Sequence, residues 1–464
     1  MSAINNESSH SGPTSRKELR RVMLASYVGS AVEYYDFLLY VTASSLVFNK
    51  LFFSDLSPTA GTIASLATLA IGYVSRPLGA LVFGHYGDRL GRKSMLIVTL
   101  MMMGVSTTLI GLLPTSEQVG ALAPVLLILL RVVQGISVGG EWGGASLMAF
   151  EHAPVGRRGF ATGVIAAGGP TGTALAAAAL GLSSLMPEEQ FFSWGWRVPF
   201  LISAALVAIG VWARLKVSES PLFIEEQQRR QERGDAPKLP LWEVLRAPRP
   251  LILAFLGLLS TFTFYSLVSS FGLAYARDRG LSLSVVLGIQ VIGGLTCVAS
   301  MIIAGAASDR FGRRAVLVFG AVAGSVFTYP FLQLIDSGET AQTMIAFIVM
   351  FGPVVGPLFG PTGAFLSEQF DTGSRYTGAS LGYQAASTVG GGFAPVILVS
   401  LMAAQDGGHG FILLFAVGIG VLSILALAVM PSRRGTRAKS TVTDAPRQPL
   451  PATEEVGPRE PGRT

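Results

Sequence analysis

The sequence is poor in the residues that build metal centres and covalent cross-links. Its 464 residues include one cysteine, Cys297, and four histidines, which excludes an intrachain disulfide and a cysteine-rich metal cluster. Cys297 lies inside an apolar run and is interpreted as a packing residue. No G-x-x-x-x-G-K-[ST] phosphate loop and no Ser–His–acid arrangement can be recognised. The sequence therefore predicts no cofactor, no metal and no enzymatic activity.

Charged residues are scarce as well. Only 13% of the residues are charged and 50% are hydrophobic, whereas a soluble domain has about 25% charged residues. This number of charged residues is too small for the surface of a soluble protein of this size. The sequence therefore predicts that lipid surrounds most of the chain. The formal net charge is +6. The basic residues cluster in short loops rather than on one solvated face, which argues against nucleic acid as a partner.

Long apolar runs fill most of the chain. A helix needs about 20 apolar residues to cross the hydrocarbon layer. Twelve spans are predicted on this basis, near 22–48, 59–84, 94–113, 121–149, 160–185, 197–215, 251–275, 283–307, 315–335, 341–366, 377–403 and 410–430. The span 341–366 contains Pro353, Pro357 and Pro361 and is predicted to bend. Lys and Arg concentrate in the even-numbered loops, which places those loops and both termini in the cytoplasm.

The predicted fold is an all-α membrane protein with two six-helix bundles, at 19–215 and 250–430. A cytoplasmic linker at 216–249, with a short amphipathic helix, joins them. The segments 1–18 and 431–464 are polar and are predicted to be disordered.

A repeated motif relates the two halves. Gly84–Lys93 reads GHYGDRLGRK and Gly305–Arg314 reads GAASDRFGRR, and a Glu followed seven residues later by Arg also recurs at nearly the same offset. Such repeats predict duplicated halves. The glycines permit a tight turn, and the aspartates can accept from a neighbouring helix N-terminus or pair with an arginine. We interpret the loops as cytoplasmic latches, although basic residues could simply fix the topology. The predicted gate residues are Asp88, Arg89, Gly91, Arg92, Glu151, Arg158, Asp309, Arg310, Gly312, Arg313, Glu368 and Arg375.

The paired loops resemble those of the major facilitator superfamily. The runs VEYYDFLLY, RPLGALVFGHYGDRLGRK, RVVQGISVGGEWGGA, SWGWRVPF and YTGASLGYQAASTVGGGFAP narrow the resemblance to its metabolite:proton symporter family, over about Ala25–Met430. Within that family the chain is most similar to the shikimate transporter branch. The resemblance implies twelve helices in two pseudo-symmetric bundles and uptake of organic acids, proline or betaine-type osmolytes.

Charged residues inside membrane spans are costly and usually functional. Glu33 and Asp36 lie three residues apart on one face of the first span, and Arg131 lies in the fourth. A carboxylate in a low-dielectric cavity beside a cation can load and release a proton near neutral pH. We predict that Asp36, with Glu33, couples transport to protons and that Arg131 is its partner. A fixed structural ion pair is the alternative.

Arginines inside the spans are candidate ligands for an anionic substrate. Arg131 could bind a carboxylate bidentately, with Gln134 on the same helix face. A permanent pair with a carboxylate of the first span would instead indicate a neutral or zwitterionic substrate. For Arg76, substrate contact and a structural pair are equally open, and for Glu141 so are a gate pair and a substrate role. The predicted substrate-binding residues are Arg131, Arg76, Tyr40, Gln134, Trp142, Tyr265, Tyr383 and Gln384. The aromatic residues among them could equally be packing residues.

The predicted function is proton-coupled symport of a small polar metabolite, such as a shikimate-like or dicarboxylic acid, by alternating access. The protein is predicted to be a multi-pass monomer of the inner membrane whose partners are substrate, protons and lipid. Uptake of a zwitterionic osmolyte, uniport, antiport and a non-transporting sensor of the same fold are alternatives. Because the spans of the second half carry almost no charge, coupling is assigned to the first half and the shaping of the substrate pocket to the second.

Overall fold

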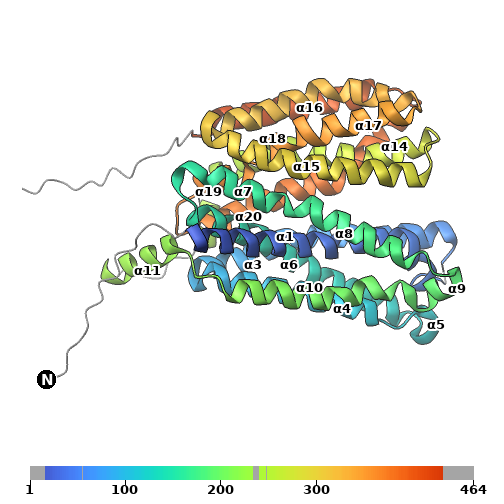
Figure 1. Cartoon of the computed structure of the whole chain (residues 1–464), viewed down its shortest axis with the longest axis horizontal. Helices are drawn as coiled ribbons and strands as arrows, with labels where there is room; N and C mark the ends of the chain where they lie inside the picture. The colour runs from blue at the N-terminus through green and yellow to red at the C-terminus, as the bar shows by residue number, and fades with distance from the viewer. Residues whose placement is uncertain (1–15, 55, 234–239, 247, 432–464) are drawn as a thin grey trace, which may run out of the picture. The chain divides into compact units, whose positions relative to one another are not determined.

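The computed structural model describes residues 16–54, 56–233, 240–246 and 248–431. These residues form helices joined by short loops, and no strand occurs among them (Figure 1). In lipid each backbone N–H and C=O needs a partner within the protein, and a helix supplies these partners by itself. The predicted all-α fold is confirmed.

The first half, before the linker, contains six long helical segments. They are α1 (Arg16–Ala43), α3 (Pro58–Leu90), α4 (Arg92–Leu112), α6 (Leu122–His152), α7 (Arg158–Ala166) continued by α8 (Gly168–Ser183), and α10 (Arg197–Leu215). Short elements connect them: η1 (Ser44–Phe48), α2 (Asn49–Leu51), α5 (Ser116–Val119), η2 (Val155–Arg157), α9 (Glu188–Gln190) and η3 (Phe191–Gly195).

The second half repeats this order with more interruptions. Its helices are α13 (Pro248–Ser266), α14 (Gly272–Asp278), α15 (Leu283–Phe311), α16 (Arg313–Asp336), α17 (Thr340–Val349), α18 (Gly356–Phe359), α19 (Thr362–Gln369), α20 (Arg375–Ala386), α21 (Ala394–Ala403) and α22 (Gly410–Val429). Three π-helical turns, η4 (Leu267–Phe271), η5 (Met350–Val355) and η6 (Ser387–Phe393), interrupt these spans. Pro353 lies in η5, Pro357 in the first turn of α18 and Pro361 just before α19, so the regular helix of the span 341–366 is interrupted where its prolines lie, as a bend there would require.

Eleven helices of the described residues are long and apolar enough to cross a membrane, and α1 is not among them. With 28 residues and a rise of about 1.5 Å each, α1 is longer than the hydrocarbon layer is thick. Its shortfall is one of composition, because Glu33 and Asp36 interrupt its apolar run. The twelfth span, and with it the cytoplasmic position of both termini, stays a prediction.

The predicted linker contains two helices, α11 (Pro221–Arg233) and α12 (Pro240–Arg246). Residues 234–239 and 247 of the linker lie outside the described residues. The same holds for 1–15 and 432–464, which make up most of the two segments predicted to be disordered. Helix α1 already begins at Arg16, inside the first of those segments.

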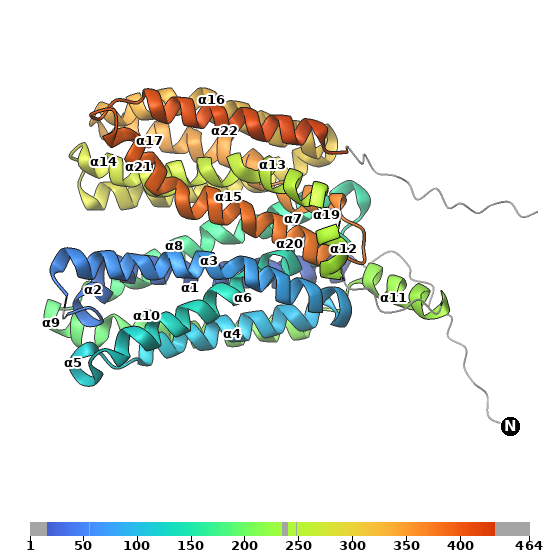
Figure 2. The same cartoon turned by 180° about the vertical axis from the view of Figure 1, so that it is seen from behind.

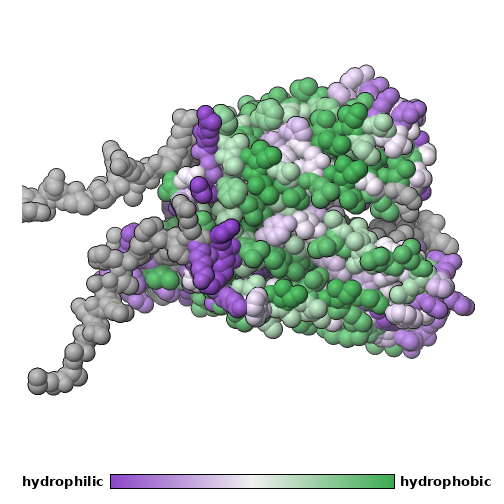
Figure 3. Space-filling view, in the orientation of Figure 1, coloured by the Kyte–Doolittle hydropathy of each residue, from purple (hydrophilic) through white to green (hydrophobic). Residues whose placement is uncertain are grey.

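Figure 3 shows apolar residues over the middle of one face and polar residues toward its two ends, the pattern expected where lipid surrounds the helices. We call the end that carries the two repeat loops, Gly84–Lys93 and Gly305–Arg314, the loop end, and the opposite end the outer end.

Close contacts join the two halves near the loop end. Helix α3 packs on α20, as Figure 2 shows, and α7 packs on α15. A Cβ atom at Gly84 would lie 2.7 Å from the Thr377 backbone, and a Cβ at Gly305 would lie 2.5 Å from the Gly159 backbone. Both crossings therefore require glycine, because any side chain would separate the helices.

Candidate transport site and gate

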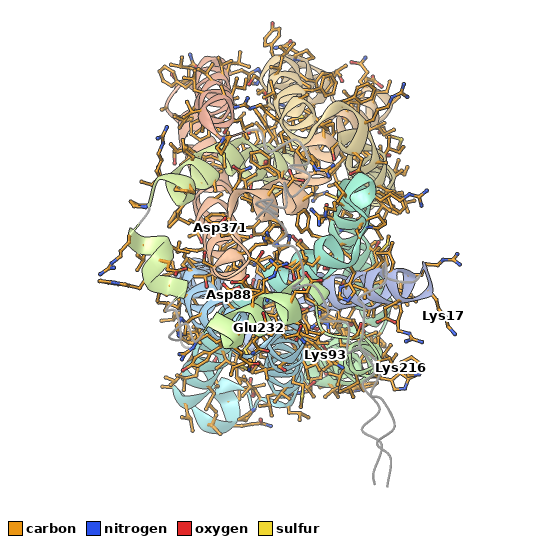
Figure 4. The ribbon with its side chains drawn as sticks, turned by 90° about the vertical axis from the view of Figure 1, so that its left-hand side faces the viewer. Lys17, Asp88, Lys93, Lys216, Glu232 and Asp371 are labelled. Carbon is orange, nitrogen blue, oxygen red and sulfur yellow. The ribbon has the colours of Figure 1, made fainter. Side chains whose placement is uncertain are left out.

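Asp88, at the end of α3, caps a helix of the other half. Its Oδ1 accepts from the backbone N–H of Tyr376 at 3.2 Å, and its Oδ2 accepts from the backbone N–H and Oγ1 of Thr377, both at 3.0 Å. Tyr376 and Thr377 lie in the first turn of α20, where backbone N–H groups have no partner within the helix. Ser374 occupies the N-cap position, but its side chain makes no capping hydrogen bond. The carboxylate therefore acts as an N-cap from the other half of the protein. Figure 4 looks onto this end and shows Asp88 near its middle.

Arg92 extends this contact into a charge network. Its Nη2 lies 3.6 Å from Asp88 and 3.5 Å from Glu151, and it donates to the Thr372 carbonyl at 3.0 Å. Glu151 in turn pairs with Arg375 Nη1 at 3.1 Å. Arg92 and Glu151 belong to the first half, whereas Thr372 and Arg375 belong to the second, so ion pairs and hydrogen bonds cross the boundary. We call this network, together with Asp88, the first latch.

Asp309, at the end of α15, makes the reciprocal contact, which we call the second latch. It accepts from the backbone N–H groups of Gly159 and Phe160, both at 2.9 Å, at the start of α7. Arg313 Nη1 lies 2.7 Å from Asp309, and Arg313 Nε lies 3.3 Å from Glu368. Each half therefore caps the second and third residues of a helix in the other half, as expected of duplicated halves.

A cavity of about 20 Å³ lies between the two halves. Its lining includes Tyr34 and Trp142 from the first half and Tyr265, Phe359 and Tyr383 from the second. The rings of Trp142 and Tyr383 are stacked with their centroids 3.4 Å apart. This volume has room for water but not for a metabolite, so the halves are closed around the cavity in this conformation.

A larger cavity of about 200 Å³ lies between α8 and α15, on the outer side of the first. Thr173 and Gln290 are among its polar lining residues, and Tyr265 and Pro170 line both cavities. The Tyr265 ring, packed on Phe359 at 5.4 Å, therefore lies between the central and the outer space.

Arg76 reaches from α3 toward the second half. Its Nη1 donates to Ser387 Oγ at 3.3 Å, and its guanidinium lies over the rings of Tyr73 at 4.2 Å and Phe37 at 4.4 Å. Arg76 is 8% exposed, its Nε has no hydrogen-bond partner, and no carboxylate lies within ion-pair distance of it in the described part of the chain. Among the described residues it is therefore a buried cation without a direct ion pair, at the boundary between the halves.

Arg131 is buried inside the first half. Its Nη1 donates to Gln134 Oε1 at 3.2 Å, and its guanidinium lies 4.0 Å from the Tyr40 ring. A Cβ atom at Gly72 would lie 2.5 Å from Arg131 Nε, so this glycine makes the space that the guanidinium occupies. Nε and Nη2 have no hydrogen-bond partner among the described residues.

The carboxylates of α1 are not paired with these arginines. Asp36 accepts a hydrogen bond from Ser203 Oγ of α10, and one oxygen each of Asp36 and Glu33 is buried without a hydrogen-bond partner in the described part of the chain. The expected Asp36–Arg131 ion pair does not occur among these residues, because the Arg131 head group turns to Tyr40 and Gln134 instead.

Glu141 and Arg214 form a buried ion pair between α6 and α10. Arg214 also donates to the Leu96 carbonyl, and Thr99 Oγ1 donates to Glu141 at 3.4 Å. A Cβ atom at Gly29 of α1 would lie 2.0 Å from Arg214 Nη2. Four helices of the first half thus enclose this pair.

Comparison with known proteins gives the family. Residues 27–305 and 253–457 match the model of the Major Facilitator Superfamily. The chain belongs to the major facilitator superfamily. The shikimate transporter of Escherichia coli K12 is 39% identical over 437 residues, which cover 91% of this chain and 97% of that protein. The proline/betaine transporter of Salmonella typhimurium is 33% identical over 81% of this chain and 76% of that protein.

The fold agrees with this assignment. The proton:xylose symporter XylE, solved with 6-bromo-6-deoxy-D-glucose, superposes with a TM-score of 0.74 at 16% identity and covers 89% of this chain and 95% of that one. Major facilitator proteins transport small molecules and are not enzymes, so the chain is a multi-pass membrane transporter.

Three of the predicted substrate residues of this major facilitator protein, Trp142, Tyr265 and Tyr383, line the central cavity. The others lie outside its lining. Tyr40 donates to Thr68 at 2.6 Å, and Gln384 donates to the Val138 carbonyl at 3.2 Å.

Most predicted gate residues take part in the two latches, and Gly91 and Gly312 have positive φ values of 106° and 96°, as their tight turns require. Arg89 and Arg310 are exposed and lie outside the networks, since they follow the aspartates on the solvent face of each helix. Arg158 stacks on Phe150 at 4.3 Å.

Sequence reasoning missed Arg214 and Ser203. Arg214 lies at the end of a span beside Lys216, where a basic residue normally extends to the headgroups. The available signal was spacing, since positions 203, 207, 210 and 214 fall on one helix face.

Proposed function

We propose that this transporter is a proton symporter that imports a small organic acid across the inner membrane as a monomer. The observation that carries the proposal is Arg76, a buried guanidinium that forms no direct ion pair within the described part of the chain and touches Ser387 of the second half. A buried cation is costly unless an anion joins it. A substrate carboxylate between the halves would provide that anion, through charge-assisted hydrogen bonds.

Arg131 supports the same chemistry from deeper in the first half. Its two nitrogens without a partner among the described residues add positive potential beside Phe37, whose ring centroid lies 4.4 Å from the Arg76 guanidinium carbon and 5.0 Å from that of Arg131. The shikimate transporter among the relatives fits an anionic substrate with a ring, because aromatic side chains line the central cavity.

Proton coupling is assigned to Asp36 and Glu33. Both side chains are buried, at 0% and 4% exposure, and each has an oxygen that no group of the described residues hydrogen-bonds. A carboxylate in that setting is stabilised by binding a proton. In this proposal the two latches form the cytoplasmic gate, which breaks when the halves rock to face the cytoplasm.

A second candidate substrate is a zwitterionic osmolyte of the betaine type. The aromatic lining of the cavity by Tyr34, Trp142, Tyr265 and Tyr383 suits a quaternary ammonium group through cation–π contacts. The proline/betaine transporter among the relatives also supports a zwitterionic substrate. The face of Trp142 is occupied by Tyr383 in this conformation, so the organic acid is the preferred candidate.

Purified protein in proteoliposomes with an imposed inward pH gradient tests the proposal. Radiolabelled shikimate, succinate and glycine betaine are supplied in turn, with the membrane potential clamped. We expect accumulation of an acid, and loss of 10- to 100-fold in its uptake in Arg76→Gln, about the 1.5–3 kcal/mol of a charged hydrogen bond. Arg76→Lys should lie in between, because it keeps the charge without the planar fork. Glu117→Gln, at an exposed position, is the matched control.

Accumulation of glycine betaine alone would favour the osmolyte. Downhill uptake that ignores the pH gradient would refute symport. Binding without any uptake, detected as a thermal shift, would favour a sensor.

A further inference from the structure

The polar residues inside the first half form two separate layers. The inner layer, nearer the loop end, is the Glu141–Arg214 pair with Thr99. Arg214 is 3% exposed and Glu141 is fully buried. The pair faces α1 at Gly29, whose missing side chain leaves room for the guanidinium.

The outer layer lies two to three helical turns away. Asp36 accepts from Ser203, Gln134 Nε2 donates to Thr107 Oγ1 at 2.7 Å, and Arg131 donates to Gln134 at 3.2 Å. Helices α4, α6 and α10 supply both layers, and α1 adds Asp36 to the outer layer and the space at Gly29 to the inner one.

An apolar layer separates them. Val32, Leu100, Met103, Val138 and Val207 form one buried cluster, again from α1, α4, α6 and α10. On α6, Val138 comes between Gln134 and Glu141, and on α10, Val207 comes between Ser203 and Arg214. A proton cannot cross such a layer without a carrier, because the cluster offers no group that binds one.

Glu33 is the one carboxylate of α1 between these layers. It lies one helical turn from Gly29 and three residues from Asp36 on the same face, so it is about 6 Å along the axis from the level of Arg214. The charged groups that act on it are Glu141, Arg76 and Arg214, and Tyr34 is its titratable neighbour. Glu141 is in turn flanked by Arg214, Thr99 and Tyr376.

We infer that the Glu141–Arg214 pair is the inner proton-release site of this transporter and that Glu33 carries the proton to it across the apolar layer. The inference rests on the proposed proton symport. In the step, the O–H bond of protonated Glu33 breaks and an O–H bond forms on the Glu141 carboxylate. The negative charge moves from Glu141 to Glu33, where Arg76 and Arg214 lie close enough to stabilise it. Arg214 is a positioning residue, since it holds Glu141 ionised and ready to accept.

The test separates net proton movement from substrate movement. Wild-type protein, Glu141→Gln and the double variant Glu141→Gln/Arg214→Gln are reconstituted, and labelled shikimate, succinate and glycine betaine are followed in two assays. One assay is accumulation under a gradient of one pH unit with the potential clamped, where one proton per substrate gives up to about tenfold accumulation. The other is exchange of internal for external substrate, which needs no net proton transfer.

We expect Glu141→Gln to accumulate no more than the external concentration while exchange persists. The double variant should behave like Glu141→Gln. Because it leaves no unpaired buried charge, it controls for misfolding of the single variant. Arg214→Lys, which keeps the cation, should retain part of the accumulation. Glu117→Gln is again the control.

Accumulation by Glu141→Gln at the wild-type level would overturn the inference and leave the proposed symport intact. Loss of both accumulation and exchange in the double variant would assign the pair a structural role and overturn it as well. A wild type that accumulates none of the three compounds would overturn the symport proposal itself, and this inference with it.

Discussion

Replacement of Asp88 by asparagine should shift the transporter away from the conformation with a closed loop end. In the native protein the Asp88 carboxylate accepts three hydrogen bonds from the first turn of α20 and lies 3.6 Å from Arg92. An asparagine keeps one acceptor oxygen and presents an NH₂ group to the remaining donors. It also removes the charge that the helix N-terminus favours.

The size of the shift follows from the bonds lost. A hydrogen bond to a charged group contributes about 1.5–3 kcal/mol, and the relief of burying a carboxylate offsets part of this loss. A net change of about 2 kcal/mol lowers the ratio of closed to open protein about 30-fold. A protein that is closed at 99:1 would then be closed at about 3:1.

Spin-label distances across the loop end measure this ratio. Leu90 and Phe311 are exposed, at 62% and 60%, and belong to different halves, so labels at these positions should leave the latches intact. The background needs one change only, Cys297→Ala, because Cys297 is the sole cysteine. We expect a second, longer distance to appear in Asp88→Asn and in Asp309→Asn, and to dominate in the double variant. A lower melting temperature with an unchanged distance distribution would refute the latch reasoning and leave Asp88 a static helix cap.

Three further predictions do not depend on which compound the protein transports. Gly72→Ala should displace the Arg131 guanidinium, 2.5 Å from the added Cβ, and reduce transport at least tenfold in the uptake assay, whereas the exposed Gly181, with open space around it, should tolerate alanine. Glu219→Gln weakens the cap that Glu219 provides to the N–H groups of Arg92 and Lys93 and should cost about 1 kcal/mol, a fall of about 1 °C in melting temperature for a chain of this length. Cys297, fully buried, should resist N-ethylmaleimide in the folded protein and react after denaturation, as mass spectrometry would detect.

The fold was predictable because backbone polar groups in lipid must find their partners within the protein. Each long apolar run had to be a helix, and the repeat of Asp88 and Asp309 on the same motif required two related halves. The exception is α1, because its two carboxylates lower its mean hydropathy. The same two carboxylates are the residues to which proton coupling is assigned. The prolines also predicted where a span is interrupted, since Pro353 lies in the π-helical turn η5.

The site was predictable only in part. Spacing along one helix correctly grouped Arg131 with Gln134, which form a hydrogen bond. Spacing cannot tell which helix lies opposite, so Asp36 was assigned to Arg131 when its partner is Ser203. The pairing depends on how α1 and α10 are rotated in the bundle, and a single sequence contains no record of that rotation.

One residue brings the gate and the membrane-embedded charges into the same structure. The backbone N–H of Tyr376 is held by Asp88 in the first latch, while its hydroxyl donates to the carbonyl of Gly140 at 2.6 Å, next to Glu141. A Cβ atom at Gly87 would overlap the ring of Tyr376 and one at Gly144 would crowd its hydroxyl, so this side chain is inserted into the first half. If α20 moves away from the first half, the hydrogen bonds of Tyr376 to Asp88 and to Gly140 must both break. The surroundings of Glu141 would then become exposed when the loop end opens. In the proposed mechanism the proton site and the first latch therefore share one moving element, α20, and opening of the latch should change the surroundings of Glu141.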